Sequence, residues 1–165
     1  MTEHYLIAED DENTQVLIVR AFKTLDLSMP VHFVETGDQV IDYLEGRGGF
    51  ADRQQYPVPA LLLLDLKMPK KNGLETLEWI RQSRWRELVT IMFTGSDEES
   101  DAREAYRLGV NSFVRKPVGF GELVQILASI HHYWFSCNYF PDDGFCFRKG
   151  LSHFKVIRRD GSCGS

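Results

Sequence analysis

The sequence predicts an α/β fold in which five strands alternate with five helices and form a doubly wound parallel sheet with right-handed crossovers. Three observations support this prediction. Five short apolar runs alternate with segments of helical spacing, the run Ala60–Leu64 contains no polar residue, and 165 residues suit one domain with a sizeable core. A short apolar run of this kind is typical of a strand buried on both faces of a parallel sheet.

The five expected strands are apolar runs that end in polar or turn-forming residues. They are His4–Ala8, Val31–Glu35, Ala60–Leu64, Leu88–Phe93 and Asn111–Arg115. The third suits the middle of the sheet because nothing polar interrupts it. It ends abruptly at Asp65, shortly before the breaker residues Pro69 and Gly73.

Apolar residues three or four positions apart predict a helix after each strand. The expected helical stripes are Val16, Val19, Phe22 and Leu25; Val40, Ile41 and Leu44; Leu74, Leu77 and Ile80; Ala102, Ala105 and Leu108; and Leu123, Leu127, Ile130 and Trp134. A long loop, Gly46–Pro59, precedes the central strand.

This periodic part is expected to form one domain over residues 1–136, followed by a short extension over residues 137–165. The extension is far shorter than an independent domain. Its basic and aromatic residues could stack on nucleic acid, but we expect a disordered or loosely docked segment. Its cysteines, Cys137, Cys146 and Cys163, match no compact zinc-binding pattern with the nearby histidines.

Composition narrows the function classes. Acidic residues outnumber basic ones by 24 to 19, and the net charge of −5 argues against a nucleic-acid binder. No apolar run approaches the ~20 residues that a membrane helix needs. The amino terminus lacks the pattern of a signal peptide, and three cysteines form no disulfide framework. A cytoplasmic protein without a membrane partner is therefore expected.

Polar side chains follow four of the expected strands, where the carboxyl ends of parallel strands meet at one edge of the sheet. These residues are Asp10 and Asp11, Asp65, Thr94 and Lys116. Taken alone, Asp65 could merely begin a turn, and the acids that follow the first strand could be a solvated cluster at a helix start. Together, the three carboxylates suit Mg²⁺ (or Mn²⁺) with a phosphate. A carboxylate there could form an aspartyl phosphate, with the ammonium and the hydroxyl contacting the phosphoryl oxygens.

Four motifs carry a resemblance to a known family. They are EDD after the first strand, LLLLDLKMPKKNG, FTGS at the fourth strand and FVRKP at the fifth. In this order the chain resembles the response-regulator receiver domain from about Glu3 to Phe135. It is most similar to single-domain receivers that partner phytochrome-type sensor kinases. The resemblance implies a flavodoxin-like sheet with strand order 2-1-3-4-5.

The resemblance also implies a role for each site residue. Asp65 would accept a phosphoryl group from a phosphohistidine of a sensor histidine kinase. Asp11 would ligate the metal directly, Asp10 directly or through a water, and Lys67 through its backbone carbonyl. Lys116 would pair with the phosphoryl group.

Two further expectations follow from the resemblance. The bond between Lys116 and Pro117 would be cis. Thr94 and Phe113 would form the switch pair, with Phe113 lacking the hydroxyl of the tyrosine that is often found there.

The leading hypothesis is a response regulator that signals by phosphorylation-dependent association, without a DNA-binding output domain. Its catalysis would be limited to its own phosphorylation and dephosphorylation. It could form a homodimer through the face built from Ser100–Leu108, Ser112–Arg115 and Phe120–Trp134. One alternative is an aspartate-nucleophile phosphohydrolase, although Lys67 stands where many such enzymes place a general acid. The other is a pseudo-receiver that binds partners without phosphorylation.

Overall fold

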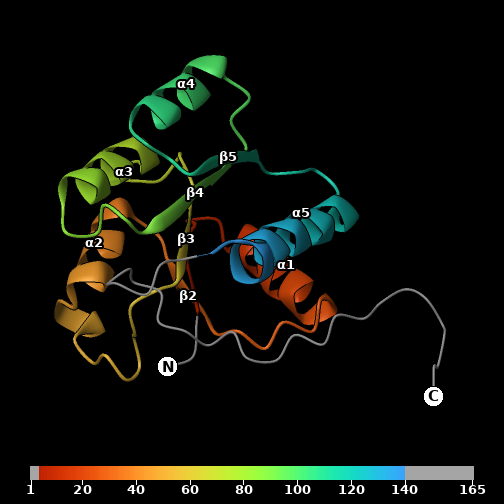
Figure 1. The fold of residues 1–165 in the computed structure, drawn as a ribbon, viewed down its shortest axis with the longest axis horizontal. Helices are drawn as coiled ribbons and strands as arrows, with labels where there is room; N and C mark the ends of the chain where they lie inside the picture. The colour runs from red at the N-terminus through yellow and green to blue at the C-terminus, as the bar shows by residue number, and fades with distance from the viewer. Residues whose placement is uncertain (1–3, 140–165) are drawn as a thin grey trace.

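The computed structural model describes residues 4–139, and it confirms the predicted doubly wound sheet. Five parallel strands lie in the order β2-β1-β3-β4-β5 (Figure 1). The strands are β1 (Tyr5–Ala8), β2 (Val31–Val34), β3 (Leu61–Leu64), β4 (Val89–Thr94) and β5 (Ser112–Arg115). The helices are α1 (Glu12–Thr24), α2 (Gly37–Glu45), α3 (Gly73–Gln82), α4 (Glu99–Arg107) and α5 (Phe120–His132). Short turns of other helix types cover Gly48–Phe50 and Tyr133–Cys137.

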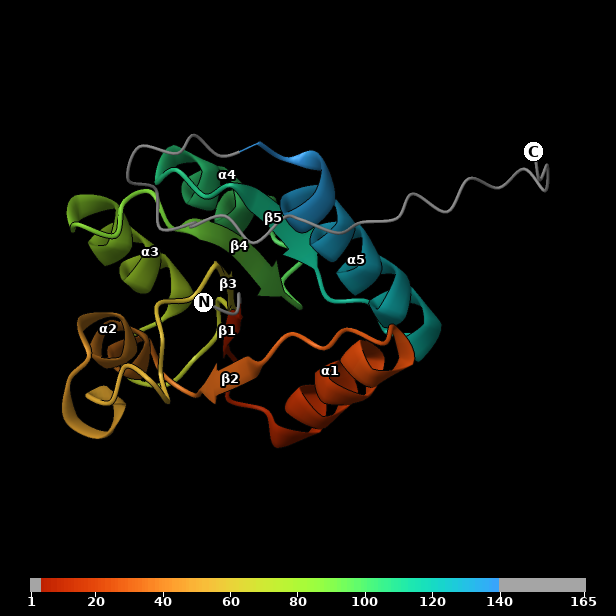
Figure 2. The same cartoon turned by 60° about the horizontal axis from the view of Figure 1, so that its bottom comes forward.

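Helices cover both faces of the sheet. Helices α1 and α5 lie on one side, and α2, α3 and α4 lie on the other (Figures 1 and 2). Successive strand residues point to opposite faces, so each strand contributes to two cores. On the α1 and α5 side the core contains Tyr5, Ile7, Leu61, Leu63, Ile91 and Phe93. On the other side it contains Leu6, Ala8, Leu62, Leu64 and Met92.

The central strand, β3, shows why the sequence folds this way. Its four leucines are all buried, because β1 and β4 flank the strand and helices cover both of its faces. Burying a leucine side chain contributes roughly 1.5–3 kcal/mol. The register pairs Ala8 with Leu64 and Leu64 with Met92, so β1 and β3 end at the same level and β4 continues for two more residues to Thr94.

Helix α1 is rotated relative to the prediction. The sequence placed Val16 and Val19 on the buried side, but they are 66% and 37% exposed. The buried residues of the helix are Ile18, Ala21 and Phe22. Two apolar stripes of helical spacing share Phe22, and the one that contains the small residue Ala21 packs inward, because a small side chain permits closer contact. Val16 and Val19 are left on the outer surface.

The predicted domain boundary at residue 136 falls within the turn Tyr133–Cys137, which continues α5. Of the expected extension, only residues 137–139 are described, and residues 140–165 lie outside the described part. Cys146, His153 and Cys163 are therefore not placed. Within residues 4–139, no helix is long and apolar enough to cross a membrane.

Candidate functional site

Asp65 is the first residue after β3, and its carboxylate is held by the backbone that follows it. Its Oδ1 accepts hydrogen bonds from the N–H of Leu66 at 2.6 Å and from that of Lys67 at 3.4 Å. The turn closes with a hydrogen bond from the N–H of Gly73 to the carbonyl of Leu66, at 2.9 Å. A Cβ at residue 73 would lie 2.3 Å from the carbonyl oxygen of Asp65, so the close approach requires glycine.

Lys116 links two carboxylates. Its Nζ lies 2.7 Å from Oδ2 of Asp65 and also forms an ion pair with Oε2 of Glu9. Its backbone N–H donates to the carbonyl of Thr94 at 2.8 Å, which extends the pairing of β4 with β5 by one residue. Burial alone would lower the pKa of Lys116, but the hydrogen bonds and attraction from Asp65 and Glu9 outweigh it and raise that pKa. The lysine is therefore held as an ammonium between the two acids.

Glu9 is a site residue that the sequence reasoning missed. It is only 2% exposed, and its Oε1 accepts a hydrogen bond from the N–H of Asp11 at 3.2 Å. Its backbone carbonyl accepts another from the side-chain amide of Gln15, at 2.7 Å. Burial raises the pKa of Glu9, while the hydrogen bond and charge of Lys116 oppose that rise.

Among residues 4–139, one group of acids has the geometry to share a metal ion. Glu9, Asp10 and Asp65 each offer a carboxylate oxygen, and these oxygens all lie within 4.8 Å of one another. Carboxylate oxygens at such separations suit a hard divalent cation such as Mg²⁺ or Mn²⁺. Asp10 is exposed, whereas Glu9 and Asp65 are buried, so a cation could reach the group from the side of Asp10.

The structure places Asp11 differently from the prediction. Its side chain is the N-cap of α1 and accepts from the N–H groups of Asn13 and Thr14. The hydroxyl of Thr14 donates to Oδ2 of Asp11 at 2.6 Å, and this hydrogen bond lowers the pKa of the carboxyl group. Asp11 is not a member of the acidic group, and Glu9 stands there instead. Asp is a favoured N-cap residue, so the start of the helix was the signal that could have shown this.

Thr94, at the end of β4, is fully buried, and its Oγ1 accepts a hydrogen bond from the N–H of Ser96 at 3.2 Å. The hydroxyl of Ser96 lies 2.6 Å from Oδ2 of Asp101, which ties this loop to α4. Phe113 is half-buried on β5, and its N–H donates to the hydroxyl of Tyr106 at 3.2 Å. A switch role for Thr94 and Phe113 remains a prediction.

Two other expectations concern the backbone. The described residues contain no cis peptide bond, so the expected cis bond between Lys116 and Pro117 was wrong. The trans form of an X–Pro bond is favoured by about 0.5–1 kcal/mol in the absence of other constraints. Lys67 follows Asp65 closely in the turn, and the metal-binding role of its carbonyl stays a prediction.

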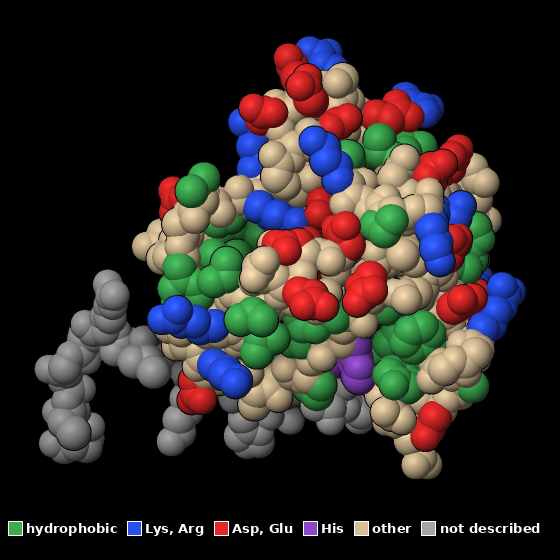
Figure 3. All heavy atoms as spheres, turned by 180° about the vertical axis from the view of Figure 1, so that it is seen from behind, with side chains coloured by type: hydrophobic (Ala, Val, Ile, Leu, Met, Phe, Trp, Pro, Cys, Tyr) green, Lys and Arg blue, Asp and Glu red, His purple; other side chains and the backbone are tan. Residues whose placement is uncertain are grey.

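Charged side chains are unevenly spread over the surface. Figure 3 shows the side of the molecule opposite to that of Figure 1, with Asp and Glu side chains gathered near the centre of the face and Lys or Arg side chains beside them. At the edge of the sheet, the ion pairs of Lys116 with Asp65 and Glu9 bring together residues that follow β1, β3 and β5.

Comparison with known proteins assigns this chain to a protein family. Residues 5–128 match the model of the response regulator receiver domain family. The chain therefore belongs to this family.

Relatives and solved structures agree with this assignment. The chain is 34% identical over 140 residues to the probable methanogenesis regulatory protein FilR2 of Methanothrix harundinacea (strain 6Ac), covering 82% of this chain and 86% of that protein. A response regulator in red light signaling of R. palustris is 34% identical with a TM-score of 0.80, covering 84% of this chain and 98% of its own. The phosphorylated cyanobacterial phytochrome response regulator RcpA is 28% identical with a TM-score of 0.78, covering 86% and 99%.

Proposed function

We propose that this chain is a phosphoacceptor response regulator in which Asp65 takes a phosphoryl group from a phosphohistidine of a sensor histidine kinase. The observation that carries the proposal is the position of Asp65, with Lys116 2.7 Å from one carboxylate oxygen and Glu9 and Asp10 close by. One Asp65 oxygen attacks phosphorus as the bond from phosphorus to the imidazole nitrogen breaks, and that nitrogen keeps the electron pair.

Each neighbouring group has a part in this step. The Lys116 ammonium forms an ion pair with Asp65 before the reaction and pairs with a phosphoryl oxygen after it. The Thr94 hydroxyl accepts from Ser96, so its own proton is free to be donated to a phosphoryl oxygen. Glu9, Asp10 and Asp65 would hold the metal, which when bound neutralises charge on the transferred group. The Mn²⁺-bound form of response regulator Rcp1 supports this metal chemistry, with 26% identity and a TM-score of 0.74 to this chain.

The same comparison suggests the pathway. Four of the similar solved structures are named for red-light or phytochrome signalling, which supports a phytochrome-type kinase as the partner. Such a kinase draws its phosphoryl group from ATP, so we place the chain in the cytoplasm. Its catalysis is limited to its own phosphorylation and dephosphorylation. Output is by protein association, with a homodimer through α4, β5 and α5 as one form.

The test is phosphorylation by acetyl phosphate, followed on a phosphate-affinity gel. The wild type should give a shifted band that depends on Mg²⁺, and Asp65→Asn should give none. Glu9→Gln should weaken metal binding, so that phosphorylation requires more Mg²⁺. Asp11→Asn, a matched loss of one charge beside the site, should have much less effect. A band that persists in Asp65→Asn, or that forms in excess chelator, would overturn the proposal.

A further inference from the structure

The motif FTGS at the end of β4 contains a serine that the proposed phosphoryl transfer does not use. Ser96 is 2% exposed, and its backbone N–H donates to Oγ1 of Thr94 at 3.2 Å. Its hydroxyl lies 2.6 Å from Oδ2 of Asp101, which belongs to the first turn of α4. The carboxylate of Asp101 is thus linked to the hydroxyl of Thr94 through one residue, Ser96.

The chemistry of the groups fixes the direction of each hydrogen bond in this chain. A carboxylate only accepts, so the hydroxyl of Ser96 donates to Asp101, and the same hydroxyl accepts from the N–H of Glu98 at 3.4 Å. The N–H of Ser96 only donates, so Thr94 accepts, and the proton of the Thr94 hydroxyl is left for another acceptor. Asp101 therefore holds the residue that occupies the accepting side of the Thr94 hydroxyl.

The sheet fixes the backbone of Thr94 but not the loop that follows it. The carbonyl of Thr94 accepts from the N–H of Lys116 at 2.8 Å, and its side chain is fully buried. The next residue, Gly95, is exposed, and a Cβ there would meet no described atom within 4 Å outside its chain neighbours. Glycine leaves the backbone between Thr94 and Ser96 free to rotate, so hydrogen bonds and not steric contacts hold Ser96 against Thr94.

The carboxylate of Asp101 is committed to this contact. In the described part of the chain, none of the salt bridges involves Asp101. By contrast, Glu99 of the same turn is exposed and pairs with Arg103 at 2.6 Å on the surface. A hydrogen bond to an ionised acceptor is stronger than one between neutral groups, so Asp101 is a firm anchor for Ser96.

We propose that Asp101 is a positioning residue for phosphoryl transfer to Asp65, and that it acts through Ser96 on the hydroxyl of Thr94. This inference rests on the proposed function. By holding Ser96, Asp101 keeps the donating side of the Thr94 hydroxyl available for a phosphoryl oxygen. A donor that is oriented in advance needs no reorientation as charge develops on the transferred group. Asp101 is not a member of the acidic group that would hold the metal, so its loss should leave metal binding unchanged.

The test compares the rates at which acetyl phosphate phosphorylates the full chain over a range of Mg²⁺ concentrations. Asp101→Ala should lower the maximal rate about threefold to tenfold, which is less than the ~100-fold that loss of a whole donor can cost. The Mg²⁺ concentration that gives half the maximal rate should stay as in the wild type. Asp101→Asn should restore most of the rate, because its amide oxygen still accepts from Ser96. Glu99→Ala, which removes an acid from the same turn of α4, is the matched control and should react like the wild type.

A double-mutant cycle shows whether Asp101 acts through Thr94. Thr94→Ala removes the hydroxyl, so the addition of Asp101→Ala to it should cause no further loss of rate. If the two losses multiply instead, Asp101 affects the rate by another route and the proposal is wrong. It is also wrong if Asp101→Ala reacts at the rate of the wild type while the wild type is phosphorylated on Asp65.

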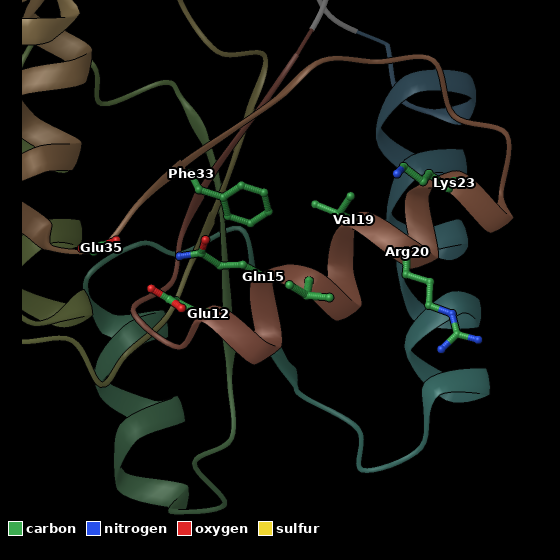
Figure 4. A pocket seen from close by; sticks show the side chains of 8 residues that line it. Glu12, Gln15, Val19, Arg20, Lys23, Phe33 and Glu35 are labelled. Carbon is green, nitrogen blue, oxygen red and sulfur yellow. The ribbon is translucent and has the colours of Figure 1, made fainter.

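NMR spectra of the same proteins without a phosphodonor separate this proposal from the proposed function. In Asp101→Ala the amide signal of Ser96 should shift and its hydrogen exchange should accelerate, whereas Asp101→Asn should resemble the wild type. Val19 and Phe33 line a groove between α1 and β2, on the side of the sheet opposite to α4, so their signals should not change (Figure 4). An unchanged Ser96 amide overturns the positioning role. If the wild type is not phosphorylated, the proposed function fails, and the Ser96 amide alone decides whether Asp101 positions Thr94.

Discussion

Replacement of Lys116 by methionine should lower the free energy of unfolding substantially when no divalent cation is present. The ammonium is the partner of both Asp65 and Glu9, whose side chains are 8% and 2% exposed. Removing one partner of a buried ion pair costs about 3–5 kcal/mol, because the remaining charge is left uncompensated. A solvent-exposed pair would contribute only about 0–1 kcal/mol. Asp10 is exposed and admits water to the site, so we expect a loss near 3 kcal/mol.

Urea unfolding at neutral pH in excess chelator measures this loss. Lys70→Met is the matched control, since Lys70 is exposed and forms none of the salt bridges of the described residues. A surface substitution of this kind should change the free energy by less than about 0.5 kcal/mol. Glu9→Gln combined with Lys116→Met should recover part of the loss, because it removes one of the two stranded charges.

Addition of Mg²⁺ is a second measurement on the same proteins. A cation that binds only the folded state raises the free energy of unfolding. At concentrations well above the dissociation constant, this gain grows with the logarithm of the cation concentration. The variant should gain more from Mg²⁺ than the wild type, because the metal replaces the missing positive charge. If the free energy of unfolding of Lys116→Met in chelator lies within about 1 kcal/mol of that of the wild type, the ion pairs are effectively screened by solvent and the reasoning is wrong.

The remaining predictions concern the helix cap, the turn and the core. Asp11→Ala should lower the free energy of unfolding by about 0.5–2 kcal/mol as an N-cap loss, while the acetyl phosphate reaction persists on the gel. Gly73→Ala should lower the thermal midpoint sharply, because its Cβ would lie 2.3 Å from the carbonyl oxygen of Asp65; an unchanged midpoint would contradict the close approach. Burial, with a smaller effect from His132, lowers the pKa of His131 from its ordinary value of 6.5. The unfolded chain therefore takes up a proton first as the pH falls below 6.5, so stability should decline there, and less steeply in His131→Gln.

The fold could be predicted because the apolar runs of the sequence identify its strands. An uninterrupted run such as Ala60–Leu64 fits only a site covered on both faces, and all five expected strands are present within a residue or two of their predicted bounds. The rotation of α1 was harder to predict. Val16 and Val19 have the same helical spacing as the residues that are buried, and only packing against the sheet and α5 decides between the two stripes.

The acidic group was predicted in kind but not in every residue. Asp10 and Asp65 lie in it as expected, but four consecutive acids follow β1, and spacing alone does not show which of them face the site. The register of the sheet does. Ala8 is paired with Leu64, so Glu9 follows β1 at the same level at which Asp65 follows β3. Counting from the last strand residue would have selected Glu9, and the preference of Asp for N-cap positions would have assigned Asp11 to the helix.

The burial of Glu9 affects the charge balance of the site. Three carboxylates and one ammonium leave two negative charges in the group when all four are ionised. Burial raises the pKa of Glu9, which shows that its negative charge is costly without a positive partner, and Lys116 is shared between two acids. One divalent cation would balance the remaining charge. A phosphoryl group on Asp65 would bring further negative charge, about −1.5 to −2 for a phosphorylated side chain near neutral pH. Lys116 and the metal would then both be needed to balance the charge of the phosphorylated site.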